Sequence, residues 1–586
     1  MLSPEYLKAI PNELIKVYQE IEDEILLDIA RRIARKDEAG YTSTYQLKQL
    51  LIGNKDFEEL KKKLKPMLYH SDEVLDEIIE NGIKTHYNDE QSIYSMVGKS
   101  LVNLDKNKAV LSQIQAYKKA MKENLNNLTK TMGVAVNDDF VNLNTLYKHE
   151  LNKAVLSTQL GVLDSTTAIR RVVNNIARGG VKFINYEGSG RNYTIESAVG
   201  MVVRSGLNRL SGEISLLNAE EMEQDLMEIS AHLGARPSHS VWQGEIVSLS
   251  GRAGYLDLQD IGYGETTGFQ GVNCRHNWYP YFEGLSYRSY SKEYLQELED
   301  KKVYYEGEEY TYYEATQIQR QLERDVRNLK KRVMMYDTVG DKEMHAIQSF
   351  KLKNKRDEYY KFSESIGINK RLENLGKFGY TKSVSGRSSY ISRQNPQEYF
   401  INSKLAKFRI VEPDITNTLK DISKDIDGKL VGLEFKFKSK ESLMRKTSAG
   451  AKELNIEFHE ALNKVNDILR YTIVHNENGF TQSFFKSKKL LEEKGFEFIR
   501  VKNTFKENQV YKGINTLVRD KKGNVFELQY HTPKSIEIKE GALHKLYEKQ
   551  RLLNPVKDKE LYKKLTDEMV SLSDMIDIPK GIERIK

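Results

Sequence analysis

Cysteine is almost missing from this chain: Cys274 is the only one among 586 residues. A single thiol excludes an intrachain disulfide, which is compatible with the reducing conditions of a cytoplasm. The sequence also lacks any run of eighteen apolar residues, so we expect no membrane span. Its first twenty residues have no basic start followed by an apolar core, so we expect no secretory signal.

Two familiar motifs are present only as fragments. The GKS string at 98–100 resembles the end of a phosphate-binding loop, but Ile93 stands where the first glycine is required. The HE pair at 459–460 resembles the start of a zinc-protease helix, but Asn463 occupies the position of the second histidine. We therefore assign neither string a function.

Positive charge is gathered in the last third of the chain. Residues 401–586 contain 37 Lys and Arg against 28 Asp and Glu, whereas the rest of the chain contains 54 against 56. Such an excess fits an anionic ligand such as a nucleotide or RNA, although a lysine-rich solvated surface would give the same count. A composition of 39% hydrophobic and 30% charged residues predicts an ordered, helix-rich protein.

The length exceeds what one hydrophobic core supports, and periodicity divides the chain into segments. The predicted segments are 1–228, helical; 229–290, rich in Trp, Gly and His; 291–375, helical; 376–400, a Gly- and Ser-rich linker or poorly packed connection; and 401–586, mixed α/β.

Residues 311–336 predict a strongly amphipathic helix. Its apolar stripe consists of Ile318, Leu322, Val326, Leu329 and Val333. Its basic side chains could contact DNA phosphates, but Glu323 and Asp325 dilute the positive field, so packing with solvated charge is the favoured interpretation. These basic residues are Arg320, Arg324, Arg327, Lys330, Lys331 and Arg332.

Segment 229–290 gathers imidazole and thiol groups, which suit zinc. The four candidates are His232, His239, Cys274 and His276. Their spacing matches no standard zinc pattern, and we favour a compact polar core around Trp242 and Trp278 instead.

Three strings in the first two thirds resemble one family. ARPSHSVWQGEIVSLSG, GVNCRHNWYPYF and YTYYEATQIQRQLERDVRNLKKRV look like the minor capsid (minor head) proteins of tailed phages and prophages, in register over about 1–375. The resemblance implies a mostly α-helical body with a small α+β core. It implies portal and capsid proteins as partners, and phage DNA as a neighbour. It places the protein in the virion, in the head interior or portal region, after assembly in the bacterial cytoplasm.

Past residue 400, period-two stretches alternate with helices, and Leu433–Lys438 is predicted as a strand. Glu527 and Gln529 are two apart on a predicted strand, so they share one face. Asp467 and Glu527, predicted on neighbouring strands, form a sensible magnesium pair. Nearby lysines would contact a triphosphate, and an aromatic ring, Tyr511, would stack on a base.

The order of motifs FKFKSKESLMRK, VNDILRYTIV, VYKGINTLV, GNVFELQYHT and ALHKLYEKQ resembles the RelA/SpoT-type synthetase domain over about 430–550. That family, whose fold is nucleotidyltransferase-like, moves pyrophosphate from ATP to the 3′-hydroxyl of a nucleotide. The resemblance implies Mg²⁺ and ATP as cofactor and donor, and it assigns roles to twelve positions. These are Asp467 and Glu527 for the metal, with Gln529 beside them; Lys436, Lys438, Ser439, Ser442, Lys446 and Arg470 for ATP; and Tyr511, Asn515 and His544 for the acceptor.

The sequence departs from that family in ways that leave the acceptor open. Lys436 stands where an arginine is usual, Asn515 where many members have histidine, and Thr472 where an arginine follows the aspartate; Arg470 could substitute for the last. The acceptor is GDP or GTP, an adenine nucleotide, or the 3′ end of tRNA. The chain has no His-Asp dipeptide, so the hydrolase half of long alarmone enzymes is missing.

Three functions remain open from the sequence. The first is a head protein carrying a pyrophosphokinase that acts as a toxin delivered with the virion into a bacterial cytoplasm, with an immunity protein to neutralise it. The second is a purely structural minor capsid protein whose C-terminal domain is an inactive binding module. The third, a nuclease toxin, has no His/Lys arrangement to support it.

Overall fold

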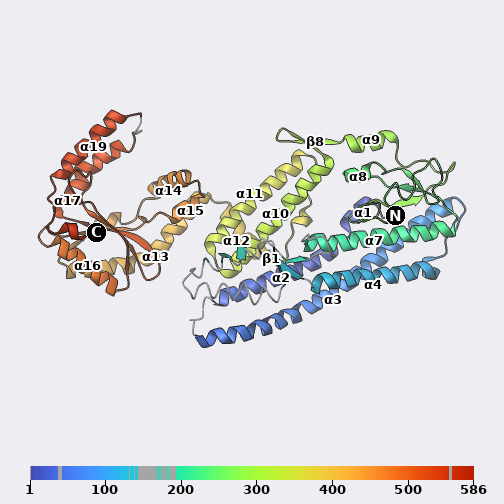
Figure 1. Cartoon of the computed structure of the whole chain (residues 1–586), viewed down its shortest axis with the longest axis horizontal. Helices are drawn as coiled ribbons and strands as arrows, with labels where there is room; N and C mark the ends of the chain where they lie inside the picture. Colours follow the sequence, from blue (N-terminus) through green and yellow to red (C-terminus); the bar gives the residue numbers. More distant parts are fainter. Residues whose placement is uncertain are drawn as a thin grey trace. The chain divides into compact units, whose positions relative to one another are not determined.

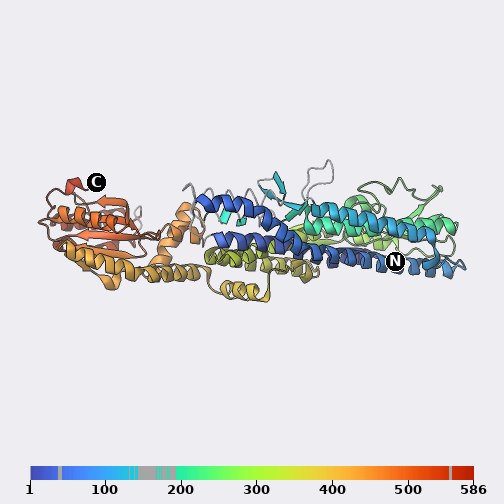
Figure 2. The same cartoon turned by 90° about the horizontal axis from the view of Figure 1, so that it is seen from below.

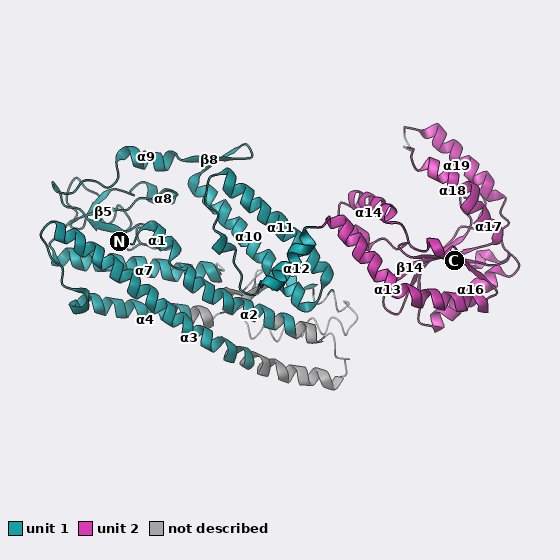
Figure 3. Ribbon diagram, turned by 180° about the vertical axis from the view of Figure 1, so that it is seen from behind, with its two compact units in different colours: residues 1–393 teal, residues 394–586 magenta. Residues whose placement is uncertain are grey.

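The computed structural model describes residues 2–36, 43–130, 132–136, 139–142, 167, 170–171, 173–174, 181–183, 193–553 and 557–586. The chain divides into two compact units, unit 1 from Met1 to Arg393 and unit 2 from Gln394 to Lys586 (Figure 3). Among the described residues, no helix is both long and apolar enough to cross a membrane.

Unit 1 is mostly helical, with short strands between its helices (Figure 1). Its elements are α1 (Pro4–Ala9), α2 (Asn12–Lys36), α3 (Ser43–Met96), η1 (Leu104–Lys106), α4 (Lys108–Lys130), β1 (Met132–Val136), β2 (Asp139–Asn142), β3 (Val181–Phe183), β4 (Tyr193–Thr194), α7 (Ile195–Glu221), β5 (Leu226–Ile229), α8 (Pro237–Ser240), β6 (Ile246–Ser248), β7 (Trp278–Pro280), α9 (Lys292–Asp300), β8 (Lys302–Tyr305), β9 (Glu308–Thr311), α10 (Tyr312–Val339), α11 (Lys342–Ser365), η2 (Leu372–Leu375) and α12 (Lys382–Ser392).

The long helices α2, α3, α4 and α7 lie side by side and share one hydrophobic core (Figures 1 and 2). Apolar residues three or four apart on each helix face this core, as an amphipathic helix requires. Ile21 and Ile25 of α2 and Val203 and Leu207 of α7 are fully buried in it. Within the described residues, the first predicted segment is thus mostly helical, with the short strands β1 to β4 between α4 and α7.

Helix α10 confirms the predicted amphipathic helix. Its start is fixed by a capping box, in which Thr311 Oγ1 accepts from the Glu314 N–H at 3.2 Å and Glu314 Oε2 accepts from the Thr311 N–H at 2.9 Å. It ends at Gly340, which takes the left-handed conformation at φ 77°. Of its basic residues, Lys331 is ion-paired with Glu22 and Arg327 with Glu196. These intramolecular pairs favour packing over DNA contact.

The segment between α7 and α9 is irregular around a three-stranded antiparallel sheet in the order β6-β5-β7. Trp242 and Trp278 are buried there together with Phe269 and Cys274. The two tryptophans thus lie in one compact core, as predicted, and the His239 and His276 rings contact Trp242 within it.

The interpretation of 376–400 as a linker or poorly packed connection is corrected by the structure. Lys377 is fully buried and ion-paired with Glu22 and Asp23 of α2, and Val384 of α12 packs into the core beneath α10 and α11. The Gly- and Ser-rich composition concealed the short helix α12. Small serine side chains, Ser388 and Ser392, are buried on its inner side in place of apolar ones, so the sequence shows no apolar period. The division between the units falls within this segment, after Arg393.

Unit 2 is a mixed five-stranded sheet with helices, in the strand order β10-β11-β14-β13-β12. The β11 and β14 strands are parallel and the other pairs antiparallel. Its elements are α13 (Pro396–Asp425), β10 (Lys429–Val431), η3 (Leu433–Phe435), α14 (Lys440–Leu454), α15 (Phe458–Asn463), β11 (Arg470–Val474), α16 (Phe480–Glu493), β12 (Glu497–Asn503), β13 (Ile514–Arg519), β14 (Val525–His531), α17 (Pro533–Ile538), the π-helical turn η4 (Lys539–Leu543), α18 (His544–Gln550), α19 (Lys559–Asp574) and η5 (Ile582–Arg584).

One face of this sheet is apolar and packs against α13 and α16. Phe526, Leu528 and Tyr530 of β14 are buried on that face, and the Tyr530 ring contacts Phe484 of α16 edge-on at 5.0 Å between centroids. Because side chains alternate along a strand, residues 527 and 529 face the opposite side.

The predicted strand Leu433–Lys438 is wrong. Gly432 turns the chain at φ 66° into the short helix η3, and Phe435 is 78% exposed, so the apolar alternation does not report a buried face. Only Phe437 forms a bridge, with Leu469 just before β11.

Candidate active site

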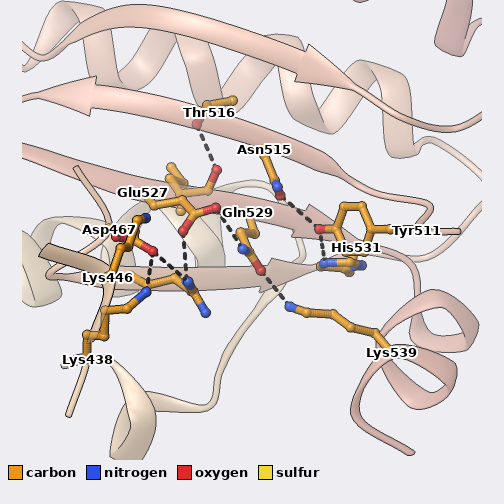
Figure 4. A network of polar contacts seen from close by, with 12 residues as sticks. Lys438, Lys446, Asp467, Tyr511, Asn515, Thr516, Glu527, Gln529, His531 and Lys539 are labelled. Atoms are coloured by element: carbon orange, nitrogen blue, oxygen red, sulfur yellow. Dashed lines mark hydrogen bonds and ion pairs between the residues drawn. The ribbon is translucent and has the colours of Figure 1, made fainter. Parts of the chain in front are cut away.

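Strand β14 carries the acid and the amide at the centre of the candidate site (Figure 4). Gln529 Nε2 donates to Glu527 Oε1 at 2.9 Å, so the two side chains share one face as predicted. In the sheet, Glu527 lies opposite Arg470 of β11, and Gln529 lies between Thr472 of β11 and Asn515 of β13. The polar face thus extends across three adjacent strands.

Asp467 precedes β11 by three residues, so it lies at the strand's entrance and not, as expected, on the strand. Its Oδ2 accepts from Lys438 Nζ at 2.5 Å, and its Oδ1 accepts from Lys446 Nζ at 2.8 Å. Burial alone would raise the pKa of Asp467, but the hydrogen bonds and charges of these two lysines lower it to about 2. Asp467 is therefore ionised throughout the physiological range.

Arg470 joins the two carboxylates. Its Nη2 lies 3.3 Å from Asp467 Oδ2, and its Nε donates to Glu527 Oε2 at 2.8 Å. Although burial would lower the pKa of Arg470, the Glu527 charge raises it, so the guanidinium stays charged. One planar cation therefore contacts both acids that the sequence pairs for magnesium.

A second group of polar residues lies beside Glu527 and Gln529. The Tyr511 hydroxyl donates to Asn515 Oδ1 at 2.8 Å and lies 2.8 Å from His531 Nε2. Lys539 Nζ donates to Gln529 Oε1 at 2.5 Å and lies 5.9 Å from the centre of the Tyr511 ring. Burial, together with the nearby Arg470 charge, lowers the pKa of Lys539 to about 8.

The structure also shows which predicted residues lie outside this network. Lys436 Nζ is bound to Glu412 of α13 at 2.7 Å, and His544 is exposed on α18, 3.9 Å from Glu548. Ser439 is the N-cap of α14, its Oγ accepting from the Ser442 N–H at 3.2 Å. The cap orients the helix that carries Lys446, while a role of Ser439 or Ser442 toward ATP stays a prediction.

The carboxylates fit a hard divalent cation. Such ions take oxygen ligands, and the carboxylate oxygens of Asp467 and Glu527 both contact one guanidinium, that of Arg470. Each Asp467 oxygen already has a basic partner, so magnesium would compete with Lys438, Lys446 and Arg470 for these oxygens. A ligand that attracts the three bases would ease that competition.

Two residues of the site were missed by sequence reasoning. His531 follows Glu527 and Gln529 at the same spacing of two, so strand alternation could have found it. Lys539 begins the π-helical turn η4, whose extra residue per turn is a common feature of functional sites but has no simple sequence signature.

The chain resembles known phage proteins over its first part. The family phage minor capsid protein 2 matches residues 2–363. A structural protein of Lactococcus phage LL-H is 24% identical over 207 residues, covering 34% of this chain and 53% of that protein. A structural protein of Lactococcus phage mv4 is 34% identical over 92 residues, covering 16% and 66%. The chain therefore spans between about half and two thirds of the length of these curated relatives.

Several solved structures are similar to part of the chain. The complex of the Type VI effector Tas1 with its immunity protein matches at 18% identity, covering 30% of this chain and 94% of that one, with a TM-score of 0.23. Small alarmone synthetase 1 of Bacillus subtilis with its product pppGpp matches at 18% identity, covering 30% and 93%, with a TM-score of 0.22. A GTP pyrophosphokinase family protein of Streptococcus pneumoniae matches at 14% identity, covering 28% and 89%, with a TM-score of 0.21.

Proposed function

We propose that this chain, which belongs to the phage minor capsid protein 2 family, is a virion protein. The proposal further assigns to unit 2 the transfer of pyrophosphate from ATP to the 3′-hydroxyl of a nucleotide or tRNA end. In this proposal unit 1 associates with portal and capsid proteins. Unit 2 acts as a toxin that reaches the bacterial cytoplasm with the phage DNA, and an immunity protein restrains it.

The observation that carries this proposal is the surplus of basic side chains around two carboxyl groups on an accessible face. Asp467 and Glu527 are matched by Lys438, Lys446 and Arg470, and Lys539 adds a further base nearby. Lys446 and Arg470 keep 49% and 41% of their side-chain surface exposed. A triphosphate would satisfy this surplus, since its charges are largely stabilised by positioned cations.

The donor would bind along α14 and the entrance of β11. When ATP binds, Lys438 and Lys446 would contact phosphate oxygens instead of the oxygens of Asp467. Arg470 would likewise leave the carboxylates of Asp467 and Glu527 and contact the phosphates. Asp467 and Glu527 would then hold Mg²⁺, which would neutralise charge on the triphosphate. Gln529, fixed by Glu527 and Lys539, would keep the acid oriented.

The reaction joins the acceptor's 3′-oxygen to the β-phosphorus of ATP. The bond between that phosphorus and the oxygen bridging to the α-phosphorus breaks, so AMP leaves and the β- and γ-phosphoryl groups move together. Glu527 would accept the proton of the 3′-hydroxyl, being the carboxylate nearest the Tyr511 side of the site. Tyr511 would orient the acceptor's base, with its hydroxyl anchored by Asn515 and His531.

An assay of the full-length chain tests this proposal. We expect the chain with magnesium and γ-labelled ATP to label one member of a panel of GDP, GTP, ADP, ATP and tRNA. Glu527→Gln should abolish the transfer while the unfolding midpoint stays close to that of the wild type. Glu537→Gln, which alters an exposed acid on α17, is the matched control and should transfer normally. Undiminished transfer by Glu527→Gln would remove the mechanism.

One observation favours the alternative, a structural capsid protein with an inactive binding module. Both oxygens of Asp467 already have basic partners, as in a network that only stabilises the fold. This alternative predicts no labelled product with any acceptor, and no harm to a bacterium that expresses the chain. Toxicity that Asp467→Ala relieves would contradict it.

A further inference from the structure

Three metal-ligating side chains converge in the small irregular region of unit 1, far along the sequence from Asp467 and Glu527. His239 comes from α8, whereas Cys274 and His276 precede β7. His239 Nδ1 lies 3.4 Å from His276 Nδ1, and Cys274 Sγ lies 3.7 Å and 3.6 Å from these two nitrogens. All three residues are at least 98% buried.

The surroundings fix which ring nitrogens carry protons. His239 Nε2 lies 2.8 Å from the Thr267 carbonyl oxygen, which can only accept, so this nitrogen is the donor. His276 Nε2 lies 3.4 Å from Gln243 Oε1, an amide oxygen that also accepts from the His232 N–H. In the neutral rings, both Nδ1 atoms therefore present lone pairs to each other and to the sulfur.

Such an arrangement is poorly satisfied by hydrogen bonds alone. The Cys274 thiol has one proton, which can serve one Nδ1 and leaves the other facing an acceptor. Both rings are buried, so a positive charge on either of them would be poorly solvated. A cation between the three atoms would satisfy all of them.

The three separations fit the edges of a tetrahedron around zinc. With Zn–N bonds of about 2.0–2.1 Å and a Zn–S bond of about 2.3 Å, ligands at the tetrahedral angle lie about 3.3–3.4 Å apart for two nitrogens and about 3.5–3.6 Å for nitrogen and sulfur. The observed 3.4, 3.7 and 3.6 Å agree with these values. The carbonyl and amide oxygens of Thr267 and Gln243 are partners of the kind that orient metal-bound histidines.

We propose that unit 1 binds one zinc ion through His239 Nδ1, Cys274 Sγ and His276 Nδ1. The fourth ligand is a water molecule, because His232 only stacks on His276, with 4.5 Å between centroids, and its Nδ1 lies 3.1 Å from the Leu233 carbonyl oxygen. The ion ties α8 to the loop before β7. This region has only three-residue and four-residue strands, so a metal clip would add stability that its small sheet lacks.

Metal analysis of the full-length chain tests this site. We expect about one zinc per chain after expression with zinc in the medium, and about one for His345→Gln, a matched control with a buried histidine elsewhere in unit 1. Cys274→Ser and His276→Gln should lose most of the zinc. Since Cys274 is the only thiol, one equivalent of a mercurial should release the ion.

A spectroscopic measurement on the wild type avoids the risk that these variants fail to fold. Exchange of the zinc for Co²⁺ should give the intense thiolate-to-cobalt charge-transfer band of a tetrahedral site. The proposal is overturned if the wild type holds less than about a tenth of an equivalent of zinc, or if bound cobalt shows no thiolate band.

Discussion

Unit 1 and unit 2 each contain a group of ion-paired acids and bases, and the two groups differ in burial and in charge balance. The closed network of unit 1 is almost wholly buried, with two acids and two bases. The open network of unit 2 is partly exposed, with two acids and three bases. The closed network consists of Glu22, Asp23, Lys331 and Lys377, and the open network of Asp467, Glu527, Lys438, Lys446 and Arg470.

This difference separates a structural role from a binding role. In the closed network side-chain exposure is 5% or less, so no ligand can reach the charges, and they balance each other. Removing one partner there would leave a buried charge, which is costly. In the open network three bases, of which Lys446 and Arg470 are partly exposed, outnumber the two acids, and this surplus is what the proposed function assigns to an anion. The charge balance of a network is thus as informative as its geometry.

The largest expected effect comes from breaking the closed network. Lys377→Met removes the base that Glu22 and Asp23 share, and should lower the stability of unit 1 by about 3–5 kcal/mol. Denaturant unfolding followed by a probe in each unit measures this, and unit 2 should unfold as in the wild type. A loss below about 1 kcal/mol would contradict the distinction.

Breaking the open network should affect chemistry more than stability. Asp467→Asn should lower pyrophosphate transfer by about 100-fold to 1,000-fold, or about 2.7–4 kcal/mol of transition-state stabilisation. Its effect on folding should stay near 1 kcal/mol, because the partners Lys446 and Arg470 remain solvated. Rates at saturating ATP, with unfolding curves of the same preparations, measure both. If Asp467→Asn is strongly destabilised but transfers at the wild-type rate while folded, the open network has a structural role and not a binding role.

A smaller effect is expected from pH. Lys539, with its pKa lowered to about 8, loses its charge as the pH rises through 8, so an anionic acceptor should bind about fivefold more weakly at pH 9 than at pH 7. Lys539→Arg stays charged and should flatten this dependence. The KM for the acceptor, measured from pH 7 to pH 9 in both proteins, tests this prediction. If the KM of Lys539→Arg rises as much as that of the wild type, another group causes the pH dependence.

The smallest expected effect concerns the cap of α14. Ser439→Ala should destabilise the first turn of that helix by about 1 kcal/mol, because the Ser442 N–H loses its acceptor. Amide hydrogen exchange at Ser442 should accelerate accordingly. Ser442→Ala is the matched control, since the cap uses only its main-chain N–H, and it should leave that exchange unchanged.

Much of unit 2 could be predicted because its local signals agree with its fold. The alternation of helices with period-two stretches past residue 400 and the shared face of Glu527 and Gln529 both follow from periodicity. The alternation at 433–438 led to a wrong prediction of a strand. Period two is necessary for a half-buried strand, but it does not show whether anything covers the apolar side. Phe435 has no such cover.

What the sequence could not show depends on contacts between distant residues. Lys377 sits in a Gly- and Ser-rich stretch, and nothing local indicates that its partners lie more than 350 residues away. The alignment of the His239 and His276 rings depends on Thr267 and Gln243, whose roles no spacing rule describes. Lys539 contacts Gln529 because α17 begins just after β14 and leads into the turn η4, whose first residue is Lys539.

The parallel pairing of β11 with β14 has a consequence for the order of synthesis. Arg470 emerges from the ribosome well before its register partner Glu527, and β10 and η3 are made earlier still. A nascent chain that ends before β14 holds the lysines and Asp467 but no sheet centre on which to align them. Whatever chemistry unit 2 performs therefore begins only after β14 has been translated, by which time unit 1 has already left the ribosome.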